Sequence, residues 1–369
     1  MSEPHAHRRH ALRNHLREQE LDAMLVTELL NIRYLTGFTG SNAALVVHAA
    51  DEPGTEPRTV FCTDGRYLTQ AESQVPDLER VIERASDLAL AERIGGTAAE
   101  HRRVGFESQH VTVDGLDALA DAAGKAELVR APGLVERLRL IKDETEIEAL
   151  RFACAAADRA LADLIEYGGL RPGRTELEVA RELETRMLDN GAAGPSFATI
   201  IAAGPNSAVP HHRPTGAVLA AGDFVKMDFG ALVDGYHSDM TRTVVLGKPA
   251  DWQREIYELV RASQAAGRGA LSIGTEVKDV DAAARKLIED AGFGEQFPHG
   301  LGHGVGLEIH EAPALSQRGD GRIAAGMAVT VEPGVYLAGR GGVRIEDTLV
   351  VRPSTPELLT LTTKELVEV

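Results

Sequence analysis

Cysteine is scarce in this sequence, which has two cysteines in 369 residues. Cys62 lies in the strand-like stretch TVFCTD, and Cys154 lies on the apolar face of a predicted helix. Nothing in either stretch indicates an activated thiol, so neither cysteine is a candidate nucleophile. Two buried, reduced thiols are the simpler interpretation, and they agree with a cytoplasmic location.

Long hydrophobic runs and an excess of positive charge are also missing. No stretch reaches the roughly 18 apolar residues of a membrane-spanning helix, and residues 1–20 lack the apolar core of a signal peptide. The 39 Lys and Arg residues are outnumbered by 56 Asp and Glu, which gives a formal net charge of -17. Such a chain repels nucleic-acid phosphate and anionic membranes, so we exclude both as partners.

The hydrophobic pattern predicts two domains. Strands are expected at 24–28, 42–49, 58–64 and 102–107, with helices at 5–20 and 91–101, an α/β alternation typical of a small independent domain. A capping box, Asp143 with Glu146 three residues later, begins the next helix. We therefore expect an N-terminal α/β domain over 1–135 and a second domain over 136–369.

The second domain contains an internal repeat. AAGDFVKMDFG (220–230) aligns without a gap with AAGMAVTVEPG (324–334), so that Asp228 corresponds to Glu332. Upstream of each copy, PGRTELEVARELE (172–184) resembles IGTEVKDVDAAARKLIE (273–289). Two α-β halves built on one plan predict a pseudo-symmetric domain with a site between its halves.

Each copy of the repeat continues into a predicted hairpin. In the first, a turn at Asp234-Gly235 places Gly230 opposite Asp239. Asp228 then becomes a diagonal neighbour of Asp239 on the same face of the sheet. Two carboxylates placed that close repel each other unless a proton or a cation lies between them.

The second hairpin brings another pair of acids together. A loop centred at Gly339 places Glu332 opposite Glu346, with Arg344 on the same face as Glu346. If the two hairpins face each other, four carboxylates converge on one site. Balancing them needs more than one divalent cation, and oxygen-rich ligation favours Mn²⁺ over a structural zinc.

Histidines near these hairpins offer nitrogen ligands. The stretch HGLGHGVGLEIHEAP (299–313) has His299 and His303 at helical spacing, but its four glycines would cost a helix about 1 kcal/mol each. We therefore predict a Gly-rich loop and strand that brings backbone close to the site. The stretch PHH (210–212) offers further imidazoles.

Taken together, these residues resemble the pita-bread metallopeptidases, which include aminopeptidase P, prolidase, methionine aminopeptidase and the metal-free creatinase. The motifs MDFGALVDGYHSDMTRT, HGLGHGVGLEIHEAP, VTVEPGVYL and GVRIEDTLV carry the resemblance over about 136–365. NIRYLTGFTGSNA (31–43) and TDGRYLTQA (63–71) are similar to the extra N-terminal domain of bacterial Xaa-Pro peptidases. The implied architecture is a pita-bread catalytic domain preceded by a smaller, creatinase-like α/β domain.

The resemblance implies five ligands for two divalent metal ions, with Mn²⁺ expected and Co²⁺ or Zn²⁺ as alternatives. Asp228 corresponds to an acid that chelates one metal, and Asp239 and Glu346 correspond to acids that bridge both. His303 and Glu332 correspond to two ligands of one metal ion. All five are present, which argues against a creatinase-like amidinohydrolase and against a non-catalytic peptide-binding module.

Other residues match the family's catalytic and substrate-binding positions. His211 corresponds to the substrate-orienting histidine, although His212 beside it leaves the register open by one residue. His310 corresponds to the histidine that contacts the scissile peptide, and Tyr336 and Arg344 correspond to residues around the metals. The implied reaction is attack by a metal-bridging hydroxide, with Glu332 as general acid and base.

The expected substrates are short proline-containing peptides, cleaved at the N-terminal Xaa-Pro bond. A prolidase acting on dipeptides is favoured slightly over an aminopeptidase P acting on longer chains, and Arg344 is one candidate for reading the proline carboxylate. A homodimer built by the N-terminal domain is expected, and in this family the loop resembling NIRYLTGFTGS can reach a neighbouring subunit's site. A strand and loop packed within its own domain is the alternative for that segment.

Overall fold

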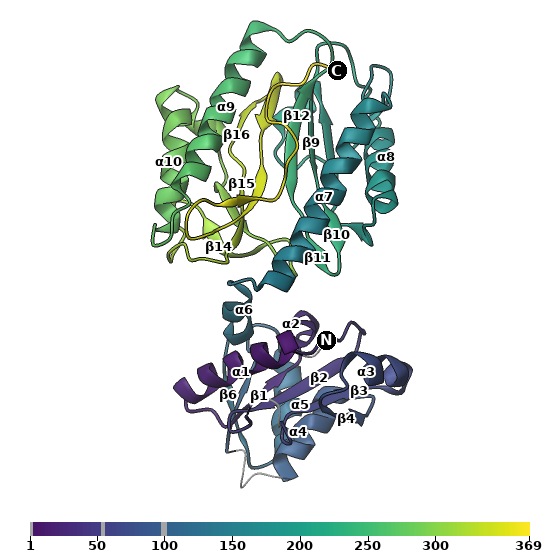
Figure 1. Cartoon of the computed structure of the whole chain (residues 1–369), viewed down its shortest axis with the longest axis vertical. Coiled ribbons are helices and arrows are strands. Elements are labelled where there is room, and N and C mark those ends of the chain that lie inside the picture. The colour runs from purple at the N-terminus through teal and green to yellow at the C-terminus, as the bar shows by residue number, and fades with distance from the viewer. Residues whose placement is uncertain (1–2, 53–55, 97–101) are drawn as a thin grey trace. The chain divides into compact units, whose positions relative to one another are not determined.

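The computed structural model describes residues 3–52, 56–96 and 102–369 (Figure 1). The chain divides into two compact units, Met1–Arg139 and Leu140–Val369. The boundary predicted between residues 135 and 136 falls within helix α6 (Leu134–Arg139), which ends the first unit. No helix in the described part of the chain is long and apolar enough to cross a membrane.

A six-stranded mixed sheet forms the centre of the first unit, in the order β4-β3-β2-β1-β5-β6. Its strands are β1 (Ala23–Val26), β2 (Ala43–His48), β3 (Val60–Thr63), β4 (Glu79–Ile82), β5 (Arg103–Phe106) and β6 (Glu127–Arg130). Around it lie α1 (Glu3–Glu18), α2 (Leu29–Thr36), η1 (Gly65–Tyr67), α3 (Leu68–Gln74), α4 (Ser86–Gly96), α5 (Val113–Ala123) and α6. Apolar residues of α4 and α5 share one buried core with the sheet.

Most of the predicted elements of this unit are confirmed. The four predicted strands correspond to β1, β2, β3 and β5, and the polar N-terminal helix is α1. The helix predicted over 91–101 begins earlier, at Ser86, and residues 97–101 lie outside the described residues. Both cysteines are free and buried, as expected.

The segment that begins at Leu29 differs from the strand-and-loop prediction. Residues 29–36 form helix α2, which begins after Glu28, whose side chain accepts a hydrogen bond from the backbone N–H of Leu30. The helix ends at Gly37, which adopts a left-handed φ of 81°. The predicted strand is therefore wrong here, because these end contacts favour a helix, whereas the predicted burial is confirmed for residues such as Ile32, Tyr34 and Leu35.

The second unit is built from two pairs of helices around several small sheets. The helices are α7 (Glu144–Glu166), α8 (Glu176–Asp189), α9 (Asp251–Ala270) and α10 (Val277–Asp290), with the short η2 (Gly204–Ala208) and η3 (Gly294–Gln296). Figure 1 shows α7 and α8 along one side of the strands, and α9 and α10 along the other. The predicted capping box of Asp143 and Glu146 is present at the start of α7.

Each half of this unit has its own strands. The first half contains β7 (Gly194–Pro195), β8 (Ile200–Ala203), β9 (Phe224–Phe229), β10 (Ala231–Val233), β11 (Tyr236–His237) and β12 (Met240–Val245). The second contains β13 (Gly302–Gly304), β14 (Glu311–Leu315), β15 (Ala328–Val331), β16 (Gly334–Leu337), β17 (Gly341–Arg344), β18 (Asp347–Val350) and β19 (Glu357–Leu358). Two buried hydrophobic clusters lie in this unit, one in the first half and one mainly in the second, which Phe224 of β9 and Val245 of β12 also join.

The sequence repeat is a structural duplication. In each copy a left-handed glycine precedes the helix, Gly173 at φ 92° before α8 and Gly274 at φ 88° before α10. A second one precedes the strand, Gly222 at φ 88° before β9 and Gly326 at φ 86° before β15. Equivalent turns at equivalent places confirm the pseudo-symmetric α/β architecture expected for the second domain.

The strand registers agree with both predicted hairpins. β9 pairs with β12 so that Asp228 lies opposite Thr241, which is the register of a turn at Asp234-Gly235. In the second half, Val331 pairs with Asp347 and Gly334 pairs with Arg344, which leaves Glu332 and Glu346 opposite each other between these pairs.

Backbone and side-chain contacts join the two halves at the acids. The backbone N–H of Glu346 donates to the carbonyl oxygen of Thr241 at 3.1 Å. The hydroxyl of Thr243 donates to the carbonyl oxygen of Arg344 at 3.0 Å. The duplicated strands of the two halves therefore present their carboxylates to one place.

Candidate metal and substrate site

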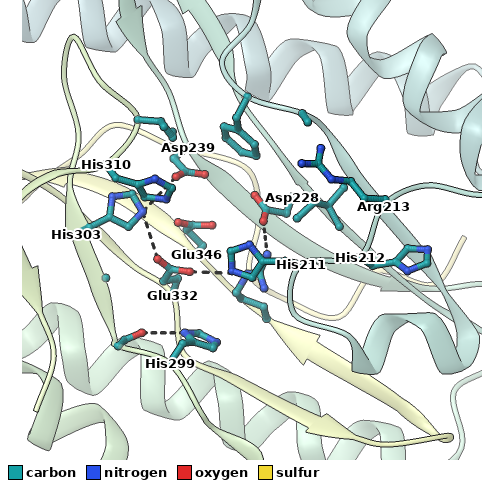
Figure 2. Close-up of a pocket in the computed structure, with 17 residues that line it drawn as sticks. His211, His212, Arg213, Asp228, Asp239, His299, His303, His310, Glu332 and Glu346 are labelled. Atoms are coloured by element: carbon teal, nitrogen blue, oxygen red, sulfur yellow. Dashed lines mark hydrogen bonds and ion pairs between the residues drawn. The ribbon is translucent and has the colours of Figure 1, made fainter. Parts of the chain in front are cut away.

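A cavity of about 380 Å³ lies in the second unit, where the two halves meet (Figure 2). Every predicted site residue lines it except Tyr336, which lies behind Arg344 and contacts its guanidinium. The cavity is lined by polar groups from β9, from β13 and from the ends of β15 and β17, together with a few apolar side chains. The structure therefore brings together residues that are more than a hundred positions apart in the sequence.

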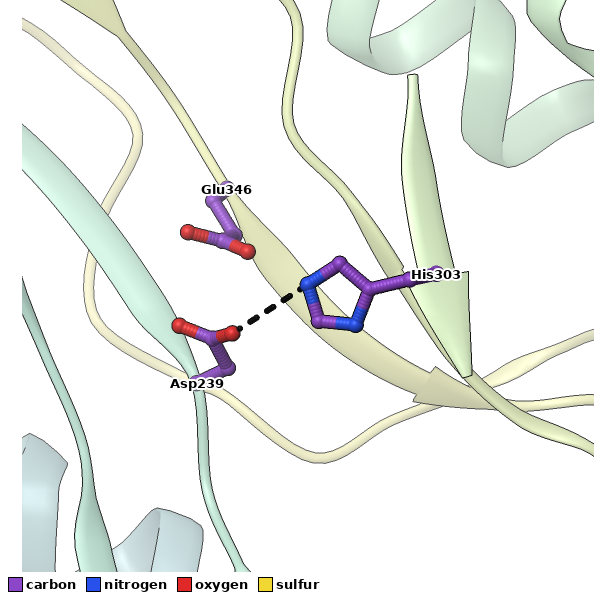
Figure 3. A group of neighbouring side chains, drawn as sticks. All are labelled: Asp239, His303 and Glu346. Carbon is purple, nitrogen blue, oxygen red and sulfur yellow. Dashed lines mark ion pairs between the residues drawn. The ribbon is translucent and has the colours of Figure 1, made fainter. Parts of the chain in front are cut away.

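Three of these residues converge closely enough to hold one metal ion. Ligand atoms of Asp239, His303 and Glu346 all lie within 4.8 Å of one another (Figure 3). The Nε2 atom of His303 is 3.5 Å from Asp239 Oδ2 and 3.4 Å from Glu332 Oε1. Its Nδ1 is 2.9 Å from the carbonyl oxygen of Gly304, which makes Nδ1 the protonated nitrogen. The lone pair of Nε2 is then directed at the acids, as in a metal-ligating histidine.

Glycine allows His303 to reach this position. A Cβ at Gly302 would lie 2.1 Å from the carbonyl oxygen of Thr330, and one at Gly304 would lie 2.0 Å from that of Ala312. β13 therefore fits between β14 and β15 only with glycine on both sides of His303. The prediction of a Gly-rich strand instead of a helix is confirmed, for this steric reason.

The carboxylates of the cavity repel one another. Burial first, and then the neighbouring acids, raises the pKa of Asp239 and of Glu346 well above the usual range. Burial likewise raises the pKa of Glu332 to about 7, against the opposing charge of Arg344. Acids held in this way favour a bound cation over bare carboxylates.

One oxygen of Glu346 gives independent support for a cation. Glu346 Oε2 accepts a hydrogen bond of 2.6 Å from the hydroxyl of Thr241. Its Oε1 is buried and has no hydrogen-bond partner among the described residues. A buried carboxylate oxygen without a partner is costly unless an ion binds it. The donor set therefore fits divalent metal ions.

Arg344 is held by close contacts with four residues, and its Nε also lies 3.9 Å from a carboxylate oxygen of Glu332. Its Nη2 forms an ion pair with Asp228, and its Nε donates to the hydroxyl of Thr241 at 3.0 Å. Its Nη1 donates to the hydroxyl of Tyr336 at 2.9 Å and to the carbonyl oxygen of Pro210 at 3.2 Å. Each guanidinium nitrogen is thus in use inside the protein, so the arginine fixes the orientation of Asp228 and has no free edge for a substrate carboxylate.

The structure distinguishes the two adjacent histidines. His212 Nε2 lies 2.8 Å from a carboxylate oxygen of buried Glu176, away from the acids. His211 points into the cavity between Asp228 and Glu332 in Figure 2. Burial, and then the charge of Arg344, lowers the pKa of His211. His211 is therefore the imidazole that faces the acids.

His310 stands beside His303 on the other wall of the cavity. Their ring centroids are 4.5 Å apart in an edge-to-face arrangement. The next residue, Glu311, forms a 2.8 Å ion pair with buried Lys142 and accepts a hydrogen bond from the backbone N–H of Glu308. These contacts tie both ends of the loop that carries His310.

Two further residues of this region were given no role by the sequence reasoning, although His299 was among the histidines considered. His299 lines the cavity and its Nε2 lies 2.9 Å from the hydroxyl of Tyr336; burial and Arg344 lower its pKa to about 3, so it is neutral. Lys226 is fully buried and its Nζ donates to the carbonyl oxygens of Val209 and Pro210, at 2.5 and 3.2 Å. The motif around His299 was a signal for the first, whereas a lysine inside a strand gave none for the second.

Comparison with known proteins places this geometry among metallopeptidases. A model of metallopeptidase family M24 matches residues 148–353, and a model of the creatinase/prolidase N-terminal domain matches residues 8–141. An Xaa-Pro dipeptidase of Pyrococcus furiosus is 35% identical over 350 residues, which cover 95% of this chain and 96% of the relative.

Two solved structures share the fold over nearly the whole chain. An Xaa-Pro dipeptidase from Bacillus anthracis superposes with a TM-score of 0.91 at 38% identity, covering 99% of this chain and 100% of that one. An X-Pro aminopeptidase from Thermotoga maritima superposes with a TM-score of 0.86 at 32% identity, covering 95% and 98%.

Proposed function

Because the chain belongs to metallopeptidase family M24, we propose that it hydrolyses the N-terminal Xaa-Pro bond of short peptides and that Xaa-Pro dipeptides are its preferred substrates. The observation that carries this proposal is the convergence of Asp239, His303 and Glu346 in a small cavity beside Asp228 and Glu332. The Xaa-Pro dipeptidases of Pyrococcus furiosus and Bacillus anthracis, which align with 95% and 99% of the chain, support the choice of substrate.

Two divalent cations are proposed as the cofactor. Their ligands are Asp228, Asp239, His303, Glu332 and Glu346, in which four carboxylates and one imidazole suit Mn²⁺, with Co²⁺ or Zn²⁺ as alternatives. The unpartnered oxygen of Glu346 and the raised pKa values of the acids support this assignment. When bound, such a pair of ions lowers the pKa of a water molecule and polarises a peptide carbonyl.

The side chains around the ions would transfer the proton of the attacking water and position the peptide. Glu332 accepts a proton from the attacking water at its carboxylate and delivers it to the leaving proline nitrogen. His310 donates a hydrogen bond to the developing oxyanion, and His211 orients the peptide from the opposite wall. Arg344 lines the cavity and pairs with Asp228, and Tyr336 behind it holds the guanidinium, so both act by keeping Asp228 in place.

The remaining lining of the cavity suits a proline. Phe197, Ala198, Ile200 and Ile309 provide an apolar surface for the pyrrolidine ring. The imide nitrogen of proline carries no N–H, so recognition relies on the shape of the ring and on the two charged ends of the substrate. The free α-amine of the first residue is placed at the acids, which restricts cleavage to the N-terminus.

Two other enzyme activities and one non-enzyme role compete with this proposal. An aminopeptidase P shares the fold, as the Thermotoga maritima structure shows, so that only substrate length distinguishes it. A creatinase-like amidinohydrolase needs no metal, and a non-catalytic binding module needs no metal-ligating residues. The presence of all five proposed ligands in one cavity favours a metallopeptidase over both.

We also propose that the protein is cytoplasmic and forms a homodimer. Both cysteines are free and buried, which suits a reducing compartment such as the cytoplasm. A homodimer remains our expectation from the family resemblance, and size-exclusion chromatography with light scattering measures it directly.

The first test compares two substrates on protein loaded with Mn²⁺. One is an Xaa-Pro dipeptide, and the other is an Xaa-Pro tripeptide with the same first residue. We expect the dipeptide to be cleaved far more efficiently, while an Xaa-Ala dipeptide serves as the control for proline selectivity. Efficient cleavage of the tripeptide would establish the aminopeptidase alternative, and cleavage of neither would refute the Xaa-Pro activity.

A further inference from the structure

A dipeptide brings two opposite charges into the cavity, and the proposed function accounts for only one of them. Its α-amine is placed at the acids, whereas its proline carboxylate needs a cationic partner. The lining contains two arginines and no lysine among the described residues. Arg344, the candidate from the sequence, is buried and has its three guanidinium nitrogens bound to the protein. The carboxylate therefore requires a different residue.

Arg213 meets this requirement. It lines the same cavity, and its guanidinium extends from the 211–213 segment toward the pocket in Figure 2. The side chain is exposed, and it forms no hydrogen bond or ion pair with the described residues. It is thus the cation of the cavity wall whose hydrogen-bond donors are available to a ligand.

The backbone on both sides of Arg213 is held in place. On one side, Lys226 and Arg344 both donate to the carbonyl oxygen of Pro210. On the other, the N–H of Thr215 donates to Glu176 at 2.9 Å, and the same carboxylate binds His212. A segment anchored this closely presents its arginine at a defined place on the cavity wall, as a specificity residue requires.

We propose that Arg213 binds the α-carboxylate of the proline in an Xaa-Pro dipeptide. The inference rests on the proposed function and assigns one residue to the choice of substrate length. A guanidinium forms two parallel hydrogen bonds with a carboxylate, and a peptide that continues beyond proline has a neutral amide at that point. The cavity then matches a zwitterionic dipeptide at both ends, with acids and metals at the amine and Arg213 at the carboxylate.

The test uses the metal-loaded enzyme with three variants. Arg213→Gln removes the charge, Arg213→Lys keeps it without the forked geometry, and Arg181→Gln changes an exposed arginine of α8 as the matched control. Each protein is assayed on Ala-Pro and on Ala-Pro amide, which differ only in the charge of the carboxyl end. Circular dichroism verifies that each variant is folded.

We expect Arg213→Gln to lower kcat/KM on Ala-Pro by about 10- to 100-fold, mainly through KM, and to leave Ala-Pro amide nearly unchanged. Arg213→Lys should recover part of the loss, and the wild-type KM for Ala-Pro should rise with salt. The control should behave as wild type on both substrates.

Other results would overturn the inference. An equal loss on the acid and the amide would make Arg213 a structural residue, and unchanged hydrolysis of Ala-Pro would show that the carboxylate binds elsewhere. If the wild type cleaves neither substrate, the proposed function fails, and this inference fails with it. If the wild type cleaves Ala-Pro and Arg213→Gln does so equally well, only the inference fails.

Discussion

Substitution of Glu176 tests how the segment that carries His211 and Arg213 is held in place. Glu176 does not line the cavity, but its carboxylate binds this segment. Its side chain is fully buried at the first turn of α8. One oxygen accepts hydrogen bonds from the backbone N–H of Ala203 and from Asn206, both at 2.9 Å. The other accepts from His212 at 2.8 Å and from the N–H and hydroxyl of Thr215 at 2.9 and 2.8 Å. A single carboxylate thus fixes the chain on both sides of His211.

Glu176→Gln keeps the shape of the side chain and replaces one acceptor with an amide donor. At least one buried donor of the 203–215 segment then faces another donor, and hydrogen bonds to a charged group are worth about 1.5–3 kcal/mol each. We expect the free energy of unfolding to fall by about 2–3 kcal/mol. For a unit the size of Leu140–Val369, this lowers the melting temperature by about 5–10 °C.

The same substitution should raise KM for an Xaa-Pro dipeptide about tenfold, because His211 and Arg213 lie on the loosened segment. Differential scanning calorimetry and steady-state kinetics measure the two effects. Glu184→Gln, on the same helix and without a partner among the described residues, is the matched control. An unchanged melting temperature together with an unchanged KM would refute the reasoning.

The stability difference between wild type and Glu176→Gln should depend on pH, because it follows from the pKa of Glu176. Burial alone would raise that pKa, but the hydrogen bonds from Ala203, Asn206, His212 and Thr215 lower it below the ordinary value of 4.5. A lowered pKa in the folded state contributes stability above the unfolded pKa, and this stability is lost as the pH falls through the folded pKa. The gap in melting temperature between wild type and Glu176→Gln should therefore be full at pH 7 and narrow below about pH 4.5.

Three further predictions concern the metals and the buried lysine. Asp239→Asn should abolish activity and reduce bound metal, measured by atomic emission, with the fold retained; full activity in this variant would exclude a dinuclear site. Adding Mn²⁺ at about 100 times its Kd to metal-free protein should stabilise the second unit by about 2.7 kcal/mol, seen as a higher melting temperature, and no shift would argue against binding at the acids. Lys226→Met should lower kcat/KM about tenfold, because Pro210 loses a hydrogen bond beside His211, while metal content stays unchanged. A loss of metal in that variant would show that Lys226 supports the acids and does not act through Pro210 alone.

The acids of the site could be predicted because the information that positions them is local. A two-residue turn at Asp234-Gly235 fixes the pairing of β9 with β12, and the loop at Gly339 fixes that of β16 with β17. The period of a strand then decides which side chains share a face. The sequence repeat predicted that the two hairpins face each other, because two copies of one unit bring their acids together between them.

The roles of residues 211–213, which face the proposed peptide, could not be predicted in this way. Long-range contacts decide which of these side chains are free. His211, His212 and Arg213 are adjacent polar residues, and nothing in their order tells which faces the acids. Glu176 binds His212 from 36 positions away, and this contact directs the His212 imidazole away from the acids, although all three residues line the cavity. Arg344 was the natural candidate for a substrate carboxylate until the structure showed its nitrogens bound to Asp228, Tyr336, Thr241 and Pro210.

This contrast separates the determinants of chemistry from those of substrate choice. Asp228 and His303 belong to strands, and Asp239, Glu332 and Glu346 lie at the ends of strands. The register of these strands is fixed by hydrogen bonding, so a change in loop sequence leaves these residues in place. Arg213 belongs to a segment outside the strands that is held largely by the side chains of Glu176, Lys226 and Arg344. Substrate length can therefore change by substitution at residue 213 without disturbing the proposed ligands. On this reasoning, Arg213→Gln should still bind the same amount of metal as the wild type while losing its preference for dipeptides over their amides.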